Sequence, residues 1–337
     1  MITPEKLKEI QGKMQEEGLD YLLAFDPTSI AYISGVPFSL FTSPVPALAI
    51  IPSEGKIELR LYEGDWNKTY VDERTTELTP SNWEVSLEGK IGVESFVPAY
   101  LLEHRYYKEL KMKPVKILAE SMRRKTEKEI NLMRKAGEQV DELMKFAMGN
   151  LHLPEQNLAY LLMNSCETRG MKHWPPPIVS YDENTARIIN GKLDMHPKLT
   201  DKEFKKHVLL DIYPCYRGYH VDASFTCSKV SEVSEKVIPK VRKALEELVS
   251  MATPGTSVEK FRVVAEERLG EKMSHAVVHG VGVLLHEPLG ATLEKGNVVA
   301  IEPGVYKRYG VRLETTVVVN DVPEVLVRAP LRLDLEV

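Results

Sequence analysis

The chain has 337 residues, of which 43% are hydrophobic, 28% charged and 7% aromatic, and its formal net charge at pH 7 is −5. This balance excludes collagen-like, low-complexity and strongly disordered proteins, and a nucleic-acid-binding protein would carry a basic excess. No stretch approaches the ~20 apolar residues that span a bilayer, and the charged residues 1–20 do not resemble a signal peptide. The three cysteines are too few for a disulfide framework. We therefore expect a cytoplasmic protein of one large or two domains, with neither nucleic-acid nor membrane partners.

The N-terminal third alternates helical and strand-like segments. Helical spacing of apolar residues predicts helices, and short apolar or alternating runs predict strands. In chain order we expect a helix over 5–18, strands over 21–25, 46–52 and 56–62, polar loops or edge elements over 61–86, a strand over 90–95 and a helix over 100–112.

A change of pattern at about 113–125 indicates a boundary, and we place the two domains at 1–118 and 119–337. Thr126 and Glu129 have the spacing of a capping box at the start of a long amphipathic helix, which Gly149 closes. Helices and hairpins alternate without the regular rhythm of a parallel sheet, which indicates the α+β class. Further helices are expected at 154–169, 232–251 and 261–273, with hairpins at 207–228 and 297–320.

Two aspartates lie on the first hairpin. If its turn centres between Tyr216 and Arg217, Asp211 and Asp222 pair across the strands with Cβ atoms ~5 Å apart. Opposed carboxylates in apolar surroundings repel each other, and a shared divalent cation removes that cost. The alternative is a register one residue off, which turns one aspartate toward water.

Two glutamates lie on the second hairpin. Glu302 and Glu314 end apolar runs that can be brought opposite each other, and Arg312 shares the face of Glu314 as a partner for a carboxylate. The alternative is that these glutamates form surface salt bridges. The run TTVVV after Glu314 indicates instead that the strand is buried.

Two histidines, His279 and His286, lie in an apolar segment punctuated by glycines. Their odd spacing puts them on opposite faces of a straight strand, so Gly280 and Gly282 would have to bend the chain. Either histidine by itself is more often a packed core residue than a ligand. Four carboxylates and a histidine on buried strands nevertheless match the needs of two adjacent divalent cations, of Mn, Co, Fe or Zn. Such a pair activates a bridging water and polarises a carbonyl, so the pattern predicts a two-metal hydrolase.

These blocks resemble the pita-bread metallopeptidases, which include prolidase (Xaa-Pro dipeptidase), aminopeptidase P and methionine aminopeptidase. RRKTEKEINLMRKA (123–136) resembles the helix that opens the family's catalytic domain. FDPTSIAYISGV (25–36) resembles a segment of the N-terminal domain that methionine aminopeptidase lacks. The motifs HGVG, HE, IEPGVY and VRLE match the family's blocks, and its five metal ligands match, in order, Asp211, Asp222, His279, Glu302 and Glu314.

The resemblance implies a smaller α/β creatinase/prolidase-like domain over 1–118 and a pita-bread catalytic domain over 119–337. It implies a homodimer with two divalent metal ions per subunit that hydrolyses the Xaa-Pro bond of dipeptides or peptide N-termini. Asp222 and Glu314 would bridge both ions, and Glu302 would move the proton between the bridging water and the leaving amine. His286 would help to stabilise the tetrahedral intermediate.

Two departures from the family's pattern bear on specificity. A further active-site histidine falls on Ile189 in a gapless reading, whereas anchoring on the downstream HPKLTD selects His196. The arginine that prolidases carry shortly after His-Glu is missing from HEPLGATLEKG (286–296). The alternatives are therefore an aminopeptidase P-like enzyme acting on longer peptides, and a non-catalytic or metal-free homologue that serves as a binding module.

Overall fold

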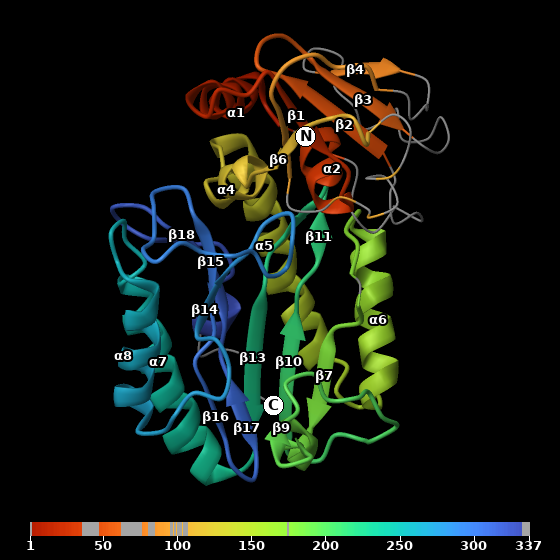
Figure 1. The fold of residues 1–337 in the computed structure, drawn as a ribbon. Helices are drawn as coiled ribbons and strands as arrows, with labels where there is room; N and C mark the ends of the chain where they lie inside the picture. Colours follow the sequence, from red (N-terminus) through yellow and green to blue (C-terminus); the bar gives the residue numbers. More distant parts are fainter. Residues whose placement is uncertain are drawn as a thin grey trace. The chain divides into compact units, whose positions relative to one another are not determined.

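The structure is a computed structural model that describes residues 2–35, 47–61, 76–79, 85–94, 97, 99, 103, 107–173 and 175–331. The chain divides into two compact units, Met1–Met122 and Arg123–Val337, and each combines helices with sheet (Figure 1). This mixture confirms the predicted α+β class. Among the described residues, none of the helices has the length and apolar character needed to cross a bilayer.

The first unit is built on a six-stranded sheet of order β4-β3-β2-β1-β5-β6. Its central strand β1 is antiparallel to β2 and parallel to β5. Thr3 and Asp26 cap the first two helices, each accepting a backbone N–H three residues on. The elements are α1 (Pro4–Glu16), β1 (Tyr21–Ala24), α2 (Pro27–Ser34), β2 (Ala47–Pro52), β3 (Ile57–Leu61), β4 (Thr76–Thr79), β5 (Ile91–Val93), β6 (Met112–Pro114) and α4 (Ile117–Arg123).

The predicted helix over 5–18 and the strands near 21–25, 46–52, 56–62 and 90–95 are confirmed, apart from end positions that lie outside the described residues. The predicted helix over 100–112 also lies largely outside the described residues. At its described end the expectation is wrong, because 107–109 form turns and Met112 begins strand β6. Most of the polar stretch 61–86 lies outside the described residues as well.

The helices of the second unit agree with the sequence patterns, except that the helix expected over 261–273 spans Val258–Leu269, because Gly270 ends it in the left-handed conformation. The capping box is present, since Thr126 Oγ1 accepts the Glu129 N–H while the Glu129 carboxylate accepts the Thr126 N–H. In Figure 1, α7 and α8 lie side by side, away from α6, which packs beside β7. The helices are α5 (Glu127–Met148), α6 (Glu155–Thr168), α7 (Ile238–Ser250), preceded by a π-helical turn (Val233–Val237), and α8 (Val258–Leu269).

Two sheets carry the predicted hairpins of the second unit. The first has the order β13-β10-β7 and the second β14-β15-β18-β19. The Glu314 N–H donates to Ser224 O, so the start of β18 is tied to β13. The main strands are β7 (Ile178–Tyr181), β10 (His207–Ile212), β13 (Ala223–Ser228), β14 (Val278–Gly280), β15 (Val298–Ile301), β18 (Thr315–Val318) and β19 (Glu324–Val325). Three two-stranded ladders accompany them: β8–β9 (Ile188–Ile189 and Lys192–Leu193), β11–β12 (Cys215–Tyr216 and Tyr219–His220) and β16–β17 (Gly304–Tyr306 and Gly310–Arg312).

Candidate active site

The first hairpin brings its two aspartates to one place by a register that differs from the prediction. Asp211 pairs with Ser224, not with Asp222, because the turn centres one residue later, on Arg217 and Gly218. Both turn residues have positive φ, 48° and 89°, as a two-residue type I′ turn requires. A shift of two residues in pairing leaves the face unchanged. Asp211 and Asp222 are both buried, at 5% and 4% exposure, so the alternative in which one faces water is wrong.

The second hairpin places its two glutamates opposite each other, as expected. Strands β15 and β18 pair on one side of Glu302 and Glu314, β16 and β17 pair on the other side, and both ladders share one register. Both glutamates lie at the short break between these ladders. Both are buried, so the alternative of surface salt bridges is wrong.

The histidine segment reverses direction instead of merely bending. After β14 the chain turns back over residues 281–286, the histidine turn, so that Gly280 and Glu287 exchange backbone hydrogen bonds. The His279 and His286 rings then lie with centroids 4.4 Å apart. A Cβ on Gly280 would lie 2.8 Å from the Glu287 carbonyl oxygen, so this close pairing requires glycine.

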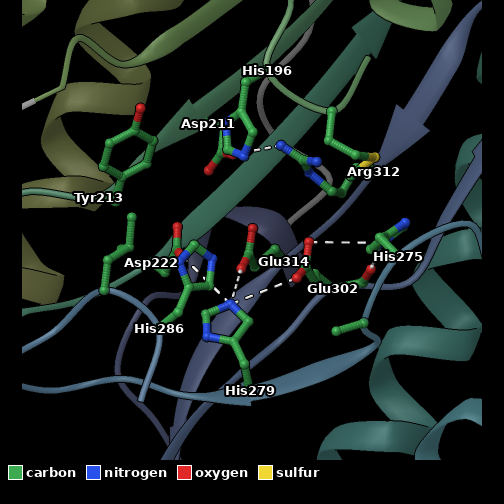
Figure 2. A pocket seen from close by; sticks show the side chains of 13 residues that line it. His196, Asp211, Tyr213, Asp222, His275, His279, His286, Glu302, Arg312 and Glu314 are labelled. Atoms are coloured by element: carbon green, nitrogen blue, oxygen red, sulfur yellow. Dashed lines mark hydrogen bonds and ion pairs between the residues drawn. The ribbon is translucent and has the colours of Figure 1, made fainter. Parts of the chain in front are cut away.

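All these side chains meet in one pocket of about 190 Å³ (Figure 2). His279 Nε2 lies 3.6 Å from Glu302 Oε1 and 3.7 Å from both Asp222 Oδ2 and Glu314 Oε1. The pocket therefore joins both hairpins and the histidine turn. Its lining residues are Met195, His196, Asp211, Tyr213, Asp222, His275, Ala276, His279, Leu285, His286, Glu302, Arg312 and Glu314.

The donor atoms of this pocket fit a divalent metal. Three groups of side chains each bring their ligand atoms within 4.8 Å of one another, and Glu314 belongs to two of them. Within the described parts of the chain, four buried ligand atoms lack a hydrogen-bond partner: Asp211 Oδ1, Asp222 Oδ1, His279 Nε2 and Glu314 Oε1. An unpaired buried polar atom is costly, and coordination to a cation would satisfy all four. The three groups are Asp211, Asp222 and Glu314; His279, Glu302 and Glu314; and Asp222, His279 and His286.

Arg312 contacts the carboxylate cluster from β17. Its Nη2 donates to Asp211 Oδ2 at 2.5 Å, its Nε donates to Ser224 Oγ at 2.8 Å, and its Nη1 lies 3.4 Å from Tyr306 Oη. Ser224 in turn donates to Glu314 Oε2 at 2.7 Å. The guanidinium thus holds one carboxylate directly and a second one through the serine hydroxyl.

Burial, reinforced by the crowding of like charges, dominates the electrostatics of the pocket. Burial, followed by the Glu314 charge, raises the pKa of Glu302 to about 8 and that of Asp222 well above its ordinary value, and burial raises the pKa of Asp211 to about 6. Burial opposes the charge on His279, but the adjacent Glu314 and Glu302 outweigh it and raise that pKa to about 9. The pKa of Glu314 is lowered despite its burial, because His279 and a guanidinium lie beside it. Protons therefore balance the excess negative charge that bound cations would otherwise balance.

The structure also locates the uncertain histidine and residues that the sequence analysis missed. His196 lines the pocket, whereas Ile189 does not. Ile189 lies on the β8–β9 ladder, and 43% of its surface is exposed. Tyr213 and His275 line the pocket too, and neither was predicted. Tyr213 stands two residues after Asp211, and the alternation of the strand could have indicated it. Nothing local indicates His275, whose Nε2 lies 2.8 Å from the Glu302 carbonyl oxygen.

Comparison with known proteins gives a consistent result. A model of metallopeptidase family M24 matches residues 131–321, and one of the creatinase/prolidase N-terminal domain matches residues 6–125. The chain is 27% identical to an Xaa-Pro dipeptidase of Pyrococcus horikoshii, over 95% of each chain. Its fold is similar to that of a Thermococcus sibiricus prolidase (TM-score 0.79, 23% identity, 98% of each chain). It is also similar to that of an X-Pro aminopeptidase from Thermotoga maritima (TM-score 0.80, 21% identity, 95% of this chain and 97% of the other).

Proposed function

This chain belongs to metallopeptidase family M24, and on that premise we propose that it hydrolyses the bond before proline in dipeptides or at peptide N-termini. The observation that carries the proposal is the convergence in the pocket of four buried ligand atoms that have no hydrogen-bond partner among the described residues. The curated relative named Xaa-Pro dipeptidase, which is matched along nearly its whole length, supports the proline-directed branch.

Two divalent ions per subunit are proposed, because two of the ligand groups share Glu314 and differ otherwise. Oxygen ligands with one imidazole suit Mn, Co, Fe or Zn. One group consists of Asp211, Asp222 and Glu314, and the other adds His279 and Glu302 to the shared glutamate. Bound there, the ions would lower the pKa of a water molecule and polarise the scissile carbonyl.

The chain's own residues would carry the remaining steps. Glu302 can hold and release a proton at its carboxylate, as transfer from water to the leaving amine requires. His286 lies beside His279 and lines the pocket, so its ring can donate a hydrogen bond to the carbonyl oxygen of the substrate as negative charge develops there. Arg312 favours the ionised form of Asp211 against the effect of burial and holds its carboxylate in place.

The test is release of free proline from Met-Pro or Leu-Pro by the full chain, with and without added Mn²⁺ or Co²⁺. Metal-dependent release that is lost in Glu302→Ala is the expected result. Silence on these dipeptides and on longer Xaa-Pro peptides, in protein that holds two metal ions, would refute the proline-directed activity. Silence in protein that binds no metal would instead favour a metal-free or binding role.

One observation favours an aminopeptidase P-like preference for longer peptides as the second candidate. Among the lining residues, Arg312 carries the one permanent positive charge, and its contacts go to Asp211, Ser224 and Tyr306. A dipeptide's carboxylate therefore meets no uncommitted guanidinium or ammonium group among them. Faster hydrolysis of an Xaa-Pro tripeptide than of the matching dipeptide would establish this preference.

A homodimer and a cytoplasmic location remain predictions, the first open to light scattering and the second to cell fractionation.

A further inference from the structure

A buried ion pair lies directly beneath the histidine turn. Lys125 Nζ and Glu287 Oε2 are 2.5 Å apart, and their side chains are 2% and 3% exposed. Neither residue lines the pocket. An ion pair shielded from water so completely is expensive to form, and it gains stability only when its geometry is good and its other polar atoms are bonded.

Glu287 is tied to the histidine turn through both its backbone and its side chain. Its backbone exchanges two hydrogen bonds with Gly280, at 2.8 and 3.1 Å. Glu287 directly follows His286 and Gly280 directly follows His279, so these bonds connect the two histidine positions. Its Oε1 lies 3.4 Å from the Leu284 N–H inside the same turn. The position of the Glu287 carboxylate is thereby coupled to the positions of both imidazoles.

Lys125 is anchored from a different part of the unit. Its backbone N–H donates to Gly296 O at 2.7 Å, directly before the cap of helix α5. A Cβ added to Gly282 would lie 2.5 Å from Glu287 Oε1 and 2.6 Å from Lys125 Cε. The ion pair therefore packs directly against the histidine turn at Gly282 and supports the turn in its position.

From these contacts we propose that Lys125 and Glu287 are positioning residues that hold His279 and His286 in the geometry required for metal binding and for substrate contact. The proposal rests on the proposed function, because it assigns the two histidines their roles there. Lys125 fixes the Glu287 carboxylate, the carboxylate fixes the turn, and the turn sets the distance between the two rings. Partners that orient metal ligands in this indirect way typically change metal affinity or activity by ~10–100-fold when altered.

The test measures Mn²⁺ affinity of the metal-free full chain by calorimetry, alongside kcat and KM for an Xaa-Pro substrate. Glu287→Asp keeps the charge but shortens the side chain by one methylene, so it cannot reach Lys125 and Leu284 together. We expect its Mn²⁺ affinity to fall by roughly 10–100-fold. Glu247→Asp makes the same shortening of a side chain in an exposed ion pair with Arg268, and we expect it to leave both Mn²⁺ affinity and kcat unchanged.

A double variant separates positioning from stability. Lys125→Met with Glu287→Met replaces the pair by apolar side chains, an exchange that often keeps or raises stability. We expect its melting temperature to stay near that of the wild type while Mn²⁺ affinity remains low. If the Glu287→Asp protein folds and binds Mn²⁺ with wild-type affinity, the proposal is overturned. If that variant does not fold, wild-type Mn²⁺ affinity in the double variant overturns it. The calorimetry needs no peptide, so a wild type that binds Mn²⁺ but cleaves no Xaa-Pro substrate contradicts the proposed function alone.

Discussion

The guanidinium of Arg312 on β17 donates to the carboxylate of Asp211 on β10, and both side chains are almost completely buried. The two residues lie far apart in the sequence, and their contact joins the two hairpins that form the pocket. Burial raises the pKa of Asp211 to about 6, and the neighbouring guanidinium acts against that rise. Asp211 Oδ2 is thus satisfied by the protein, while Asp211 Oδ1 has no partner among the described residues.

Arg312→Met should destabilise the protein strongly, because it removes the partner of a buried carboxylate while leaving that carboxylate in place. Loss of one member of a buried pair costs ~3–5 kcal/mol. The measurement is the free energy of unfolding in urea for metal-free protein. The exposed Arg308, which pairs with Glu183 at the surface, provides the control. Arg308→Met should change the free energy by less than ~1 kcal/mol, and an equal loss in both variants would contradict the special role of Arg312.

The stability of the metal-free protein should fall as the pH rises from about 6.5 to 9. Glu302 has a folded-state pKa of about 8 against an ordinary 4.5, and His279 one of about 9 against 6.5. The folded state therefore binds more protons than the unfolded state in this window, and stability falls as pH rises. Below 6.5, buried neutral histidines with pKa values of about 4, such as His275, act in the opposite sense. This opposing contribution is small above pH 6.5, so the predicted fall in stability with rising pH should be measured there.

Melting temperatures with EDTA and with Mn²⁺ at pH 6.5, 7.5 and 8.5 check this dependence. Mn²⁺ replaces the protons, so the stabilisation that it gives should grow with pH. A stabilisation by Mn²⁺ that shrinks across this range would contradict the proposed ligands.

Gly137→Ala should destabilise the protein although alanine favours helices. Gly137 lies within α5, and a Cβ there would collide with the Leu326 carbonyl oxygen. Overpacking of this kind costs ~1–3 kcal/mol. Gly12→Ala in α1 is the matched control, since nothing lies within 4 Å of its added Cβ. The control should gain up to ~1 kcal/mol, so opposite shifts in melting temperature are expected.

His196→Ala should lower kcat, whereas Ile189→Ala should leave it unchanged. His196 lines the pocket, and Ile189 lies on the exposed β8–β9 ladder. A side chain that assists proton transfer or contacts the reacting group contributes roughly 10²-fold or more. Steady-state kinetics on one Xaa-Pro substrate decides between the two residues. A larger loss for Ile189→Ala would restore the gapless reading of the sequence.

The sequence by itself determined the features that depend on near neighbours. The capping box of Thr126 and Glu129 forms between residues three apart, and it could be predicted because each partner fixes the other locally. The face of Asp211 and Asp222 could also be predicted, since strand alternation survives a shift of two residues in register. The chemistry of the donors, carboxylates with an imidazole, could be read directly from the residue types.

Only the tertiary structure decided which distant groups meet. The contact of Arg312 with Asp211, the entry of His275 into the pocket and the Lys125–Glu287 pair all join separate segments. The type I′ turn at Arg217 and Gly218 set the hairpin register, and no hydrophobic pattern distinguishes registers that differ by two residues. Periodicity reports which face a side chain occupies. The packing of one sheet against another, which is governed by volume and buried polar pairing, determines what that face touches.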